Sequence, residues 1–237
     1  MQMQRKELLY EGKAKQVWST DDPQLVIQYF KDDATAFNAQ KRGTIAAKGV
    51  LNNAISETLF KLLEDAGVRT HFVERLSERE MLVKRLSIFP VEVVVRNVVA
   101  GSLATRLGRD EGERLPSPIL ELYYKNDALG DPMINHWHVV VFGMATPEDL
   151  DVVVASSLSV NSVLVPFFAE RDLTLVDFKL EYGHTADGTI LLGDEICPDT
   201  CRLWDVATGE RLDKDRFRRD LGRVEEAYQE VYRRVVP

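Results

Sequence analysis

Cysteine is scarce in this chain, with two residues among 237. Cys197 and Cys201 cannot form a disulfide framework, and this usage favours a reducing cytoplasm as the compartment. Their spacing would supply at most half of a zinc site, and no histidine or further cysteine lies close by in the sequence to complete one. We therefore expect no zinc.

Long apolar runs and an excess of positive charge are also missing. The first twelve residues lack the apolar core of a signal peptide. The most apolar runs, residues 91–101 and 138–145, are too short to span a bilayer. Thirty Lys and Arg stand against 38 Asp and Glu, a net charge of −8. This balance argues against a general partner among nucleic acids or anionic membranes, although it allows a local basic pocket.

What is present is the composition of an ordinary globular protein, 45% hydrophobic and 29% charged, with enough length for one large domain or two lobes. In residues 176–182, VDFKLEY, apolar and charged side chains alternate. This period of two predicts a strand with one buried face and three charges on the other. Asp187-Gly188 then predicts a tight hairpin turn.

The returning half of this hairpin brings Asp194 and Glu195 to its end. Asp199, Arg202 and Asp205 follow, and we expect them in a loop ordered by neighbouring Pro and Trp residues. Carboxylates gathered on a rigid hairpin, with Lys and Arg among them, suit Mg²⁺ and phosphate chemistry. A solvated charged strand face is the alternative.

The N-terminal region reads as short strands at residues 8–12, 15–19 and 25–30. Gly12 forms a tight turn between the first two, followed by Lys13 and Lys15. Such a turn allows close approach of a ligand, and the lysines are placed to meet phosphates. The pattern is neither a Walker loop nor G-x-G-x-x-G, so a plain hairpin turn with solvated lysines stays open.

A helical stripe covers residues 51–66 and ends at Gly67. Strands are predicted at residues 71–76 and 81–86, followed by a break at residues 87–90. We interpret this break as a hinge between lobes, where an adenine ring commonly finds backbone polar groups and an apolar slot.

A second informative stretch is residues 91–108, VEVVVRNVVAGSLATRLG. It predicts a buried strand, then a short helix with Ser102 as its N-cap and Gly108 at its end. Free N–H groups at that helix start, with Gly101 before it, can bind phosphate or carboxylate. Arg96 lies within the strand, where an unpaired charge is costly; an internal ion pair and a ligand contact both remain open.

Later elements are predicted from caps and periodicity. A strand ends in Lys125, and His136 and His138 are expected on one side of an extended segment without acidic or thiolate partners, so no role is assigned to them. Thr146 starts a helix, which Pro166 should kink or break. The last helix is predicted from Asp213, with its aromatic residues in the core or at a subunit contact.

In this order the pieces resemble the SAICAR synthetase family of purine biosynthesis. The matching stretches run in family order across nearly the whole chain: LLYEGKAKQVW, DDATAFNAQKRGTI, KGVLNN, VEVVVRNVVAGSLATRLG, YYKNDALGDP, LVDFKLEYG, LGDEICPDTCRLWD and LDKDRFRRDLG. The resemblance implies an α+β fold of two lobes with antiparallel sheets and flanking helices, distantly similar to protein kinases and ATP-grasp enzymes. Residues 1–86 would form the ATP-binding lobe, and residues 87–237 the lobe with the metal and substrate sites.

The implied reaction joins the carboxylate of 5-amino-1-(5-phospho-D-ribosyl)imidazole-4-carboxylate to the amine of L-aspartate, with ATP and Mg²⁺, through an acyl phosphate. The family further implies small-molecule partners only, a cytoplasmic location and a homodimer. A kinase-like phosphotransferase is the first alternative, but no H-R-D-type loop is present. A nucleotide-binding sensor that has lost catalysis is the second.

The resemblance also assigns residues. It implies ATP contacts by Gly12, Lys13, Ala14, Lys15, Lys84, Ile88 and Lys125. Its implied Mg²⁺ ligands are Glu181 and Asp194. It implies ribonucleotide contacts by Arg96, Gly101, Ser102 and Arg202, with Asp177 and Lys179 beside the reacting carboxylate. The candidates for orienting the aspartate amine are Asp199 and the loop at residues 125–131. Cys197 departs from the family, which usually has Ser there, and packing or sensitivity to oxidation would follow.

Overall fold

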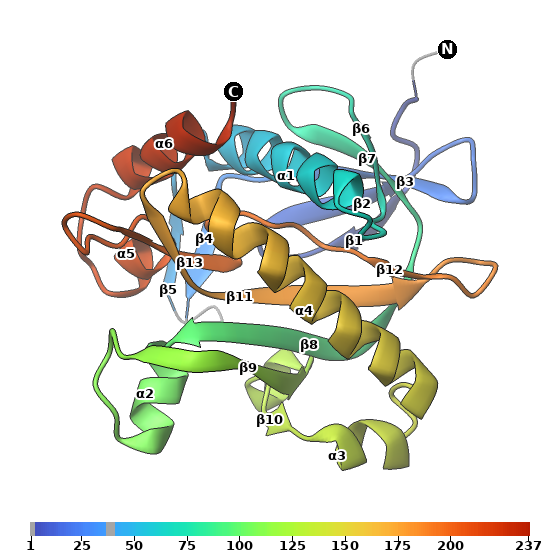
Figure 1. Cartoon of the computed structure of the whole chain (residues 1–237). Helices are drawn as coiled ribbons and strands as arrows, with labels where there is room; N and C mark the ends of the chain where they lie inside the picture. Colours follow the sequence, from blue (N-terminus) through green and yellow to red (C-terminus); the bar gives the residue numbers. More distant parts are fainter. Residues whose placement is uncertain (1–2, 37–40) are drawn as a thin grey trace.

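The structure is a computed structural model that describes residues 3–36 and 41–237. Residues 37–40, part of the matching stretch at 32–45, therefore lie outside the described residues. The architecture is α+β, as predicted, with antiparallel sheets and flanking helices (Figure 1).

The first sheet has the strand order β1-β2-β3-β7-β6, and every neighbouring pair is antiparallel. Its strands are β1 (Leu8–Glu11), β2 (Lys15–Ser19), β3 (Leu25–Phe30), β6 (Phe72–Arg75) and β7 (Glu80–Lys84). All five were predicted from the sequence. A separate two-stranded ribbon follows β3 and consists of β4 (Asp33–Ala36) and β5 (Lys41–Thr44).

The second sheet has the order β10-β9-β8-β11-β12, and β13 also pairs with β11. Its strands are β8 (Ser87–Val98), β9 (Arg114–Tyr124), β10 (Met133–Ile134), β11 (Leu173–His184), β12 (Ile190–Leu192) and β13 (Cys201–Asp205). The predicted β11–β12 hairpin is confirmed, and Gly188 supplies the positive φ of 85° in its turn. The loop expected around Arg202 is wrong, because that residue lies in β13, paired with β11.

The helices cover these sheets. They are α1 (Lys48–Asp65), α2 (Gly101–Leu107), the 3₁₀ turn η1 (Asp127–Leu129), α3 (His136–Val141), α4 (Pro147–Ala169), α5 (Asp215–Arg218) and α6 (Val224–Val235). Helix α1 packs against β3, β6 and α6, whereas α4 runs along the face of the second sheet formed by β8, β11 and β12 (Figure 1). The predicted stop of α1 is confirmed by Gly67, with φ 85°.

Helix α4 begins with the predicted cap, in which Thr146 and Asp149 bond reciprocally to each other's backbone N–H groups. Pro166 was expected to kink or break the helix; it does not break it, because α4 continues to Ala169. Pro166 is exposed, so water can bond the carbonyl group that loses its helical donor. By length and composition alone α4 is apolar enough to cross a membrane, but its buried residues, such as Leu150, Val160 and Phe168, belong to the core.

The single last helix predicted from Asp213 is wrong. The chain forms a short α5 and then breaks, with positive φ at Asp220, Gly222 and Arg223, before α6 starts. These left-handed residues turn the chain, so the aromatic residues of the two segments do not share one helical stripe.

The break predicted at residues 87–90 is also wrong, because β8 is continuous from Ser87. The chain crosses from the first sheet to the second at Arg85–Leu86, between β7 and β8. Pro90 is tolerated inside β8 because it lies opposite the register irregularity between Glu181 and Gly183 of β11, where a ladder hydrogen bond is not required of it.

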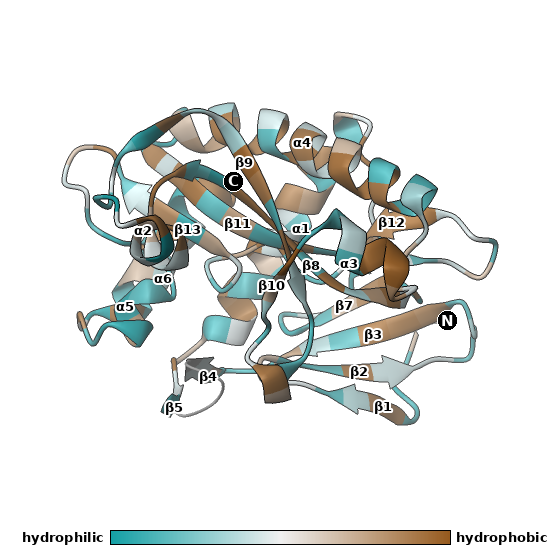
Figure 2. Ribbon diagram, turned by 90° about the horizontal axis from the view of Figure 1, so that it is seen from below, coloured by the Kyte–Doolittle hydropathy of each residue, from teal (hydrophilic) through white to brown (hydrophobic). Residues whose placement is uncertain are grey.

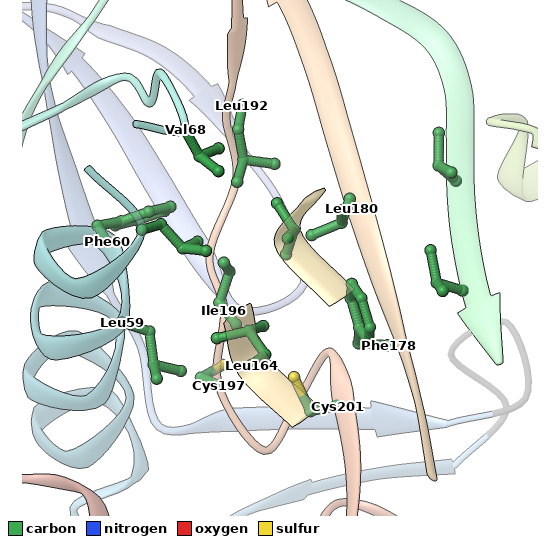
Figure 3. Close-up of a cluster of buried hydrophobic side chains, with 14 of the residues drawn as sticks. Leu59, Phe60, Val68, Leu164, Phe178, Leu180, Leu192, Ile196, Cys197 and Cys201 are labelled. Atoms are coloured by element: carbon green, nitrogen blue, oxygen red, sulfur yellow. The ribbon is translucent and has the colours of Figure 1, made fainter. Parts of the chain in front are cut away.

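One hydrophobic cluster runs through both halves of the chain. It joins Leu59 and Phe60 of α1 to Leu164 of α4 and to Phe178 and Leu180 of β11 (Figure 3). Both cysteines lie in the same cluster as free, buried thiols. The core therefore holds the two sheets together and fixes the position of their facing edges.

Candidate active site

Strands β8 and β11 form the floor of the site. Their register places Arg96 opposite Asp177 and Glu92 opposite Glu181. The alternation predicted for β11 is present, and Phe178 on its other face is fully buried. The charged face is nevertheless not solvated, because Asp177 and Glu181 are each only 4% exposed. The alternative of an exposed strand face is therefore wrong, and the buried charges need partners.

Arg96 is the centre of a buried polar network. Its guanidinium donates to Glu121 Oε2 at 2.6 Å and to Asp177 Oδ2 at 2.9 Å. It also donates to Ser102 Oγ at 3.0 Å and to Tyr123 OH at 3.1 Å. The internal ion pair that the sequence left open is therefore formed, and charge-assisted bonds fix the guanidinium plane.

Ser102 lies in the first turn of α2, but its predicted role as N-cap is wrong. The capping position belongs to Ala100, which makes no side-chain cap bond. The preceding chain bends so that Gly101, with φ 52°, opens the helix. Ser102 is therefore the second residue of α2, and its hydroxyl accepts a hydrogen bond from Arg96.

Arg202 of β13 reaches the same network from the other side of β11. It donates to both carboxylate oxygens of Asp177, at 2.8 and 2.9 Å, and to Asp215 Oδ2 at 2.8 Å. A Cβ atom on Gly101 would lie 2.6 Å from Arg202 Nη2. Glycine is therefore required at this position both for its φ and for the space that the guanidinium occupies.

A second charged cluster follows along β11. Lys179 Nζ donates to Glu181 Oε1 at 2.5 Å and to Glu92 Oε1 at 3.1 Å, and it lies 3.4 Å from Asp194 Oδ2. Lys125 also donates to Glu181. The two carboxylates expected to hold Mg²⁺ thus converge on one ammonium group, which places them close together.

Asp194 and its neighbour Glu195 meet Lys15 of β2. Burial opposes ionisation of both members of the Asp194–Lys15 pair, but their mutual attraction outweighs it. The pKa of Asp194 is lowered well below its usual value, with Lys179 contributing, and the pKa of Lys15 is raised. In Glu195, burial and the charge of Asp194 raise the pKa to about 7.

The predicted turn at Gly12 is present. The Gly12 N–H donates to the Lys15 carbonyl at 2.8 Å, and a Cβ atom at Gly12 would lie 2.9 Å from the Tyr10 ring. Lys13 reaches across to Asp127 of η1 at 2.5 Å. Lys13 and Lys15 thus link the first sheet to Asp127 and Asp194, which follow strands of the second sheet. The alternative of a turn with freely solvated lysines is therefore wrong.

These side chains surround two cavities. The first, here called the nucleotide cavity, has a volume of about 530 Å³. Its walls contain every residue assigned above to ATP or Mg²⁺: Gly12, Lys13, Ala14, Lys15, Lys84, Ile88, Lys125, Glu181 and Asp194. The second, here called the substrate cavity, has a volume of about 420 Å³. Its walls contain Arg96, Ser102, Asp177, Lys179, Asp199 and Arg202.

The two cavities meet. Six residues line both of them: Lys13, Ala14, Glu92, Asp131, Lys179 and Glu195. Of the predicted site residues, only Gly101 lines neither cavity, and it acts through the room it leaves for Arg202. Segments distant in sequence are therefore brought to one continuous cleft between the sheets.

Asp199 is held more tightly than the sequence indicated. Its carboxylate accepts bonds from Lys48 Nζ at 2.7 Å and Tyr228 OH at 2.6 Å, and Lys214 Nζ lies 3.9 Å away. Although burial opposes ionisation, Lys214 and Lys48 lower the pKa of Asp199. Lys48 is 1% exposed. The sequence analysis gave it no role, although it begins the matching stretch KGVLNN.

The histidines predicted on an extended segment lie instead in α3, and His138 Nδ1 accepts the Asn135 N–H in the helix cap. His71 was not singled out from the sequence, yet it lines the nucleotide cavity. Burial lowers its pKa to about 3, so it is neutral. Among the described residues, no group of three His, Cys, Asp or Glu side chains could hold a metal by itself.

Comparison with known proteins identifies the relatives of this chain. A family model described as SAICAR synthetase matches residues 8–235. A phosphoribosylaminoimidazole-succinocarboxamide synthase from Chlorobium chlorochromatii is 62% identical over 234 residues, covering 99% of each chain. The crystal structure of the enzyme of that name from Ehrlichia chaffeensis has a TM-score of 0.95 and 47% identity, covering 98% of this chain and 100% of that one. A SAICAR synthetase solved in complex with ADP has a TM-score of 0.93 and 49% identity, covering 97% of both chains.

Proposed function

The chain belongs to the SAICAR synthetase family, and from this premise we propose how its cleft performs the family reaction. The protein is an ATP-dependent ligase of purine biosynthesis. It joins 5-amino-1-(5-phospho-D-ribosyl)imidazole-4-carboxylate and L-aspartate into the succinocarboxamide, with release of ADP and phosphate. The observation that carries the proposal is the meeting of the nucleotide and substrate cavities at six shared residues.

ATP occupies the nucleotide cavity in this proposal. The Gly12–Lys15 turn lies over the phosphates, Lys125 adds a further contact, and the segment from Lys84 to Ile88 meets the adenine ring. Ile88 is 40% exposed and Val17 and Val26 stand in the same walls, which gives an apolar slot of the kind adenine needs. A relative at 49% identity is solved in complex with ADP, which supports nucleotide binding by this chain.

Mg²⁺ is proposed at Glu181 and Asp194. Mg²⁺ is usually bound by one or two carboxylates together with substrate phosphates, and two such carboxylates converge here on Lys179. Glu181 is buried, and the pKa of Asp194 is held well below its usual value by Lys15 and Lys179, so a cation matches the chemistry of this pair. When bound, the ion would neutralise phosphate charge next to the reacting carboxylate.

The ribonucleotide occupies the substrate cavity. Its phosphate is proposed to bind Arg202 and Ser102, with Gly101 leaving space for the guanidinium and Arg96 holding Asp177 and Ser102 in place. A fixed guanidinium suits phosphate because it offers planar, paired donors. The imidazole carboxylate then points toward the residues shared by both cavities.

The reaction is proposed to pass through an acyl phosphate. A carboxylate oxygen attacks the γ-phosphorus of ATP and ADP leaves; the aspartate amine then attacks the carboxyl carbon and phosphate leaves. Lys179 lies at the junction, where its ammonium group can stabilise the charge that develops. Asp177 orients the neighbouring cations, and Asp199 is the proposed partner of the aspartate amine. Exclusion of water protects the activated group.

The activity test omits one substrate at a time. Purified protein with MgATP, the imidazole carboxylate and aspartate should form the succinocarboxamide, and ADP release should require both other substrates. ADP release that needs neither substrate, with no succinocarboxamide formed, would overturn the proposal and favour a nucleotide-binding protein without ligase activity.

We propose that residues 1–86 serve as the nucleotide lobe and residues 87–237 as the lobe for metal and substrates, in a cytoplasmic homodimer. Helix α3 and the residue after it support the dimer: Trp137, Val141 and Phe142 are each 72% exposed, and Figure 2 shows part of this helix as strongly hydrophobic. Apolar patches of this kind mark protein contacts. Light scattering should give twice the chain mass, and Trp137→Asp should reduce it; a wild-type monomer would contradict the dimer.

A further inference from the structure

A third cavity, here called the back cavity, is not used by the proposed reaction. Its volume is about 880 Å³, larger than the 530 Å³ of the nucleotide cavity. It is lined by the β2–β3 turn, the α1–β6 connection, the crossing segment between β7 and β8, and the β11–β12 turn, and it opens to solvent. Figure 1 shows the crossing segment beside the β11–β12 turn. The back cavity has room for a molecule the size of a nucleotide.

Unpaired positive charge gathers at this cavity. Nearly every Lys and Arg side chain in the described part of the chain has an oxygen partner. The five without a hydrogen bond or ion pair are Arg69, Lys84, Arg85, Arg114 and Arg223. Three of these five, Arg69, Lys84 and Arg85, line the back cavity. Lys84 and Arg85 stand on the wall that it shares with the nucleotide cavity, and Arg69 lines the back cavity alone. In a chain of net charge −8, this concentration of free cations indicates an anionic ligand.

The carboxylates of the same cavity already have donors. Glu64 Oε1 accepts a bond from the Thr70 hydroxyl at 2.6 Å. Asp187 Oδ1 accepts from the Thr185 hydroxyl and from the Thr189 N–H. Neither acid forms an ion pair with the three cations, so the cations keep their capacity to bind a ligand.

The remaining walls mix apolar and polar side chains. Leu25 of β3, Val68 of the α1–β6 connection and Leu191 of β12 form an apolar part. Polar residues line the rest: Gln24, Thr70, Ser87, His184, Thr185 and Thr189. A small inorganic ion would leave this surface uncovered, whereas an organic molecule with a phosphate group at one end would contact both parts. The lining therefore favours an amphipathic anion.

The crossing segment connects this cavity to the nucleotide cavity. Lys84, Arg85 and Leu86 line both, so they form the wall between the two spaces. A ligand on one side of a shared wall can change the affinity on the other side, and any such coupling is reciprocal.

We propose that the back cavity binds a phosphate-bearing organic anion of nucleotide size, and that its occupancy changes the affinity of the nucleotide cavity. The binding site stands independently of the proposed function. The coupling rests on the assignment of the neighbouring cavity to ATP.

AMP serves as the probe, with saturating MgADP present to fill the nucleotide cavity of the full chain. Backbone amide NMR should show saturable shifts at residues 67–70 and 185–189. Adenosine, which lacks the phosphate, should bind at least about tenfold more weakly, because a charge-assisted hydrogen bond contributes about 1.5–3 kcal/mol. Shifts confined to Gly12–Lys15, or equal binding of adenosine, would overturn the site.

Arg69→Glu tests the cations. Arg69 is exposed and has no partner among the described residues, so its replacement should leave the fold intact. We expect it to weaken AMP binding about tenfold or more. The matched control is Arg114→Glu, which changes the net charge equally at another unpaired, exposed arginine outside this cavity. An equal loss in both variants would show general charge attraction and contradict the site.

The coupling is measured as the Kd of MgADP with and without AMP. If AMP competes directly with MgADP in the nucleotide cavity, its effect on the Kd should persist in Arg69→Glu. If AMP acts from the back cavity through the crossing segment, its effect should disappear in this variant. We expect an AMP effect of about fivefold or more, in the range typical of allosteric coupling, that Arg69→Glu abolishes. An effect of the same size in both proteins would refute the coupling while leaving the ligase assignment untouched.

Discussion

Replacing Gly101 by alanine perturbs the substrate cavity without removing any functional group. The new Cβ atom would lie 2.6 Å from Nη2 and 2.9 Å from Cζ of Arg202. Contacts this short force the guanidinium to move. Arg202 would then lose its alignment with Asp177 and Asp215, to which it donates at 2.8–2.9 Å.

Two separate effects follow from this substitution. The φ of 52° at residue 101 is in the left-handed region, which costs about 1–2 kcal/mol for a residue with a Cβ atom. Displacement of Arg202 additionally weakens a charge-assisted contact to the ribonucleotide phosphate, by about 1.5–3 kcal/mol. The second effect corresponds to a rise of about 10- to 150-fold in the KM for the imidazole ribonucleotide.

Gly108→Ala is the matched control. It lies at the other end of α2 with a similar φ of 61°, but a Cβ atom there would meet nothing within 4 Å. Urea unfolding should show the cost of the left-handed φ in both variants, with a further loss in Gly101→Ala because Arg202 is displaced from Asp177 and Asp215. Steady-state kinetics should show the raised ribonucleotide KM only in Gly101→Ala, with the KM for ATP changed less than about threefold. Equal KM values in the two variants would refute the role given to Arg202.

Three further predictions concern charge. Asp194→Asn should lower kcat by about 100-fold or more, the scale of losing one electrostatic contact to the transition state, with an unchanged circular dichroism spectrum; unchanged turnover would remove Asp194 from the proposed metal site. Lys48→Met leaves the buried Asp199 without its nearest cation and should lower the free energy of unfolding by about 3 kcal/mol; a loss below about 1 kcal/mol in urea unfolding would contradict this. Hydrogen bonding to Arg219 lowers the pKa of Glu111 from 4.5 to about 2, so its stabilisation is present above pH 4.5 and is lost as pH falls toward 2. Glu111→Gln should therefore be less stable than wild type near pH 7, with the difference shrinking below pH 4.5; a difference that grows on acidification would show the opposite linkage.

Local patterns predicted the elements of this fold well where one face of a segment is apolar. The alternation in β11 and the cap of α4 are short-range signals, and the structure confirms both. The failures arise from tertiary context. Pro90 lies inside a strand because the partner strand is irregular opposite it, and no local signal reports the register of a partner.

The site residues could be listed from the sequence, but their arrangement could not be derived from it. Motif resemblance pointed to Lys15 and Asp194, which are 179 residues apart and form an ion pair. Lys48 is buried and bonded to Asp199 because α1 packs against the segment between β12 and β13. Such contacts are set by three-dimensional packing, so periodicity cannot reveal them.

The most direct test of the proposed chemistry follows the carboxylate oxygens. The imidazole carboxylate, labelled with ¹⁸O at both oxygens, is turned over with MgATP and aspartate, and the inorganic phosphate is analysed by mass spectrometry or ³¹P NMR. An acyl phosphate formed where the two cavities meet predicts one ¹⁸O atom in each phosphate released, because the leaving phosphate takes one carboxylate oxygen with it. Phosphate released without label would contradict the account.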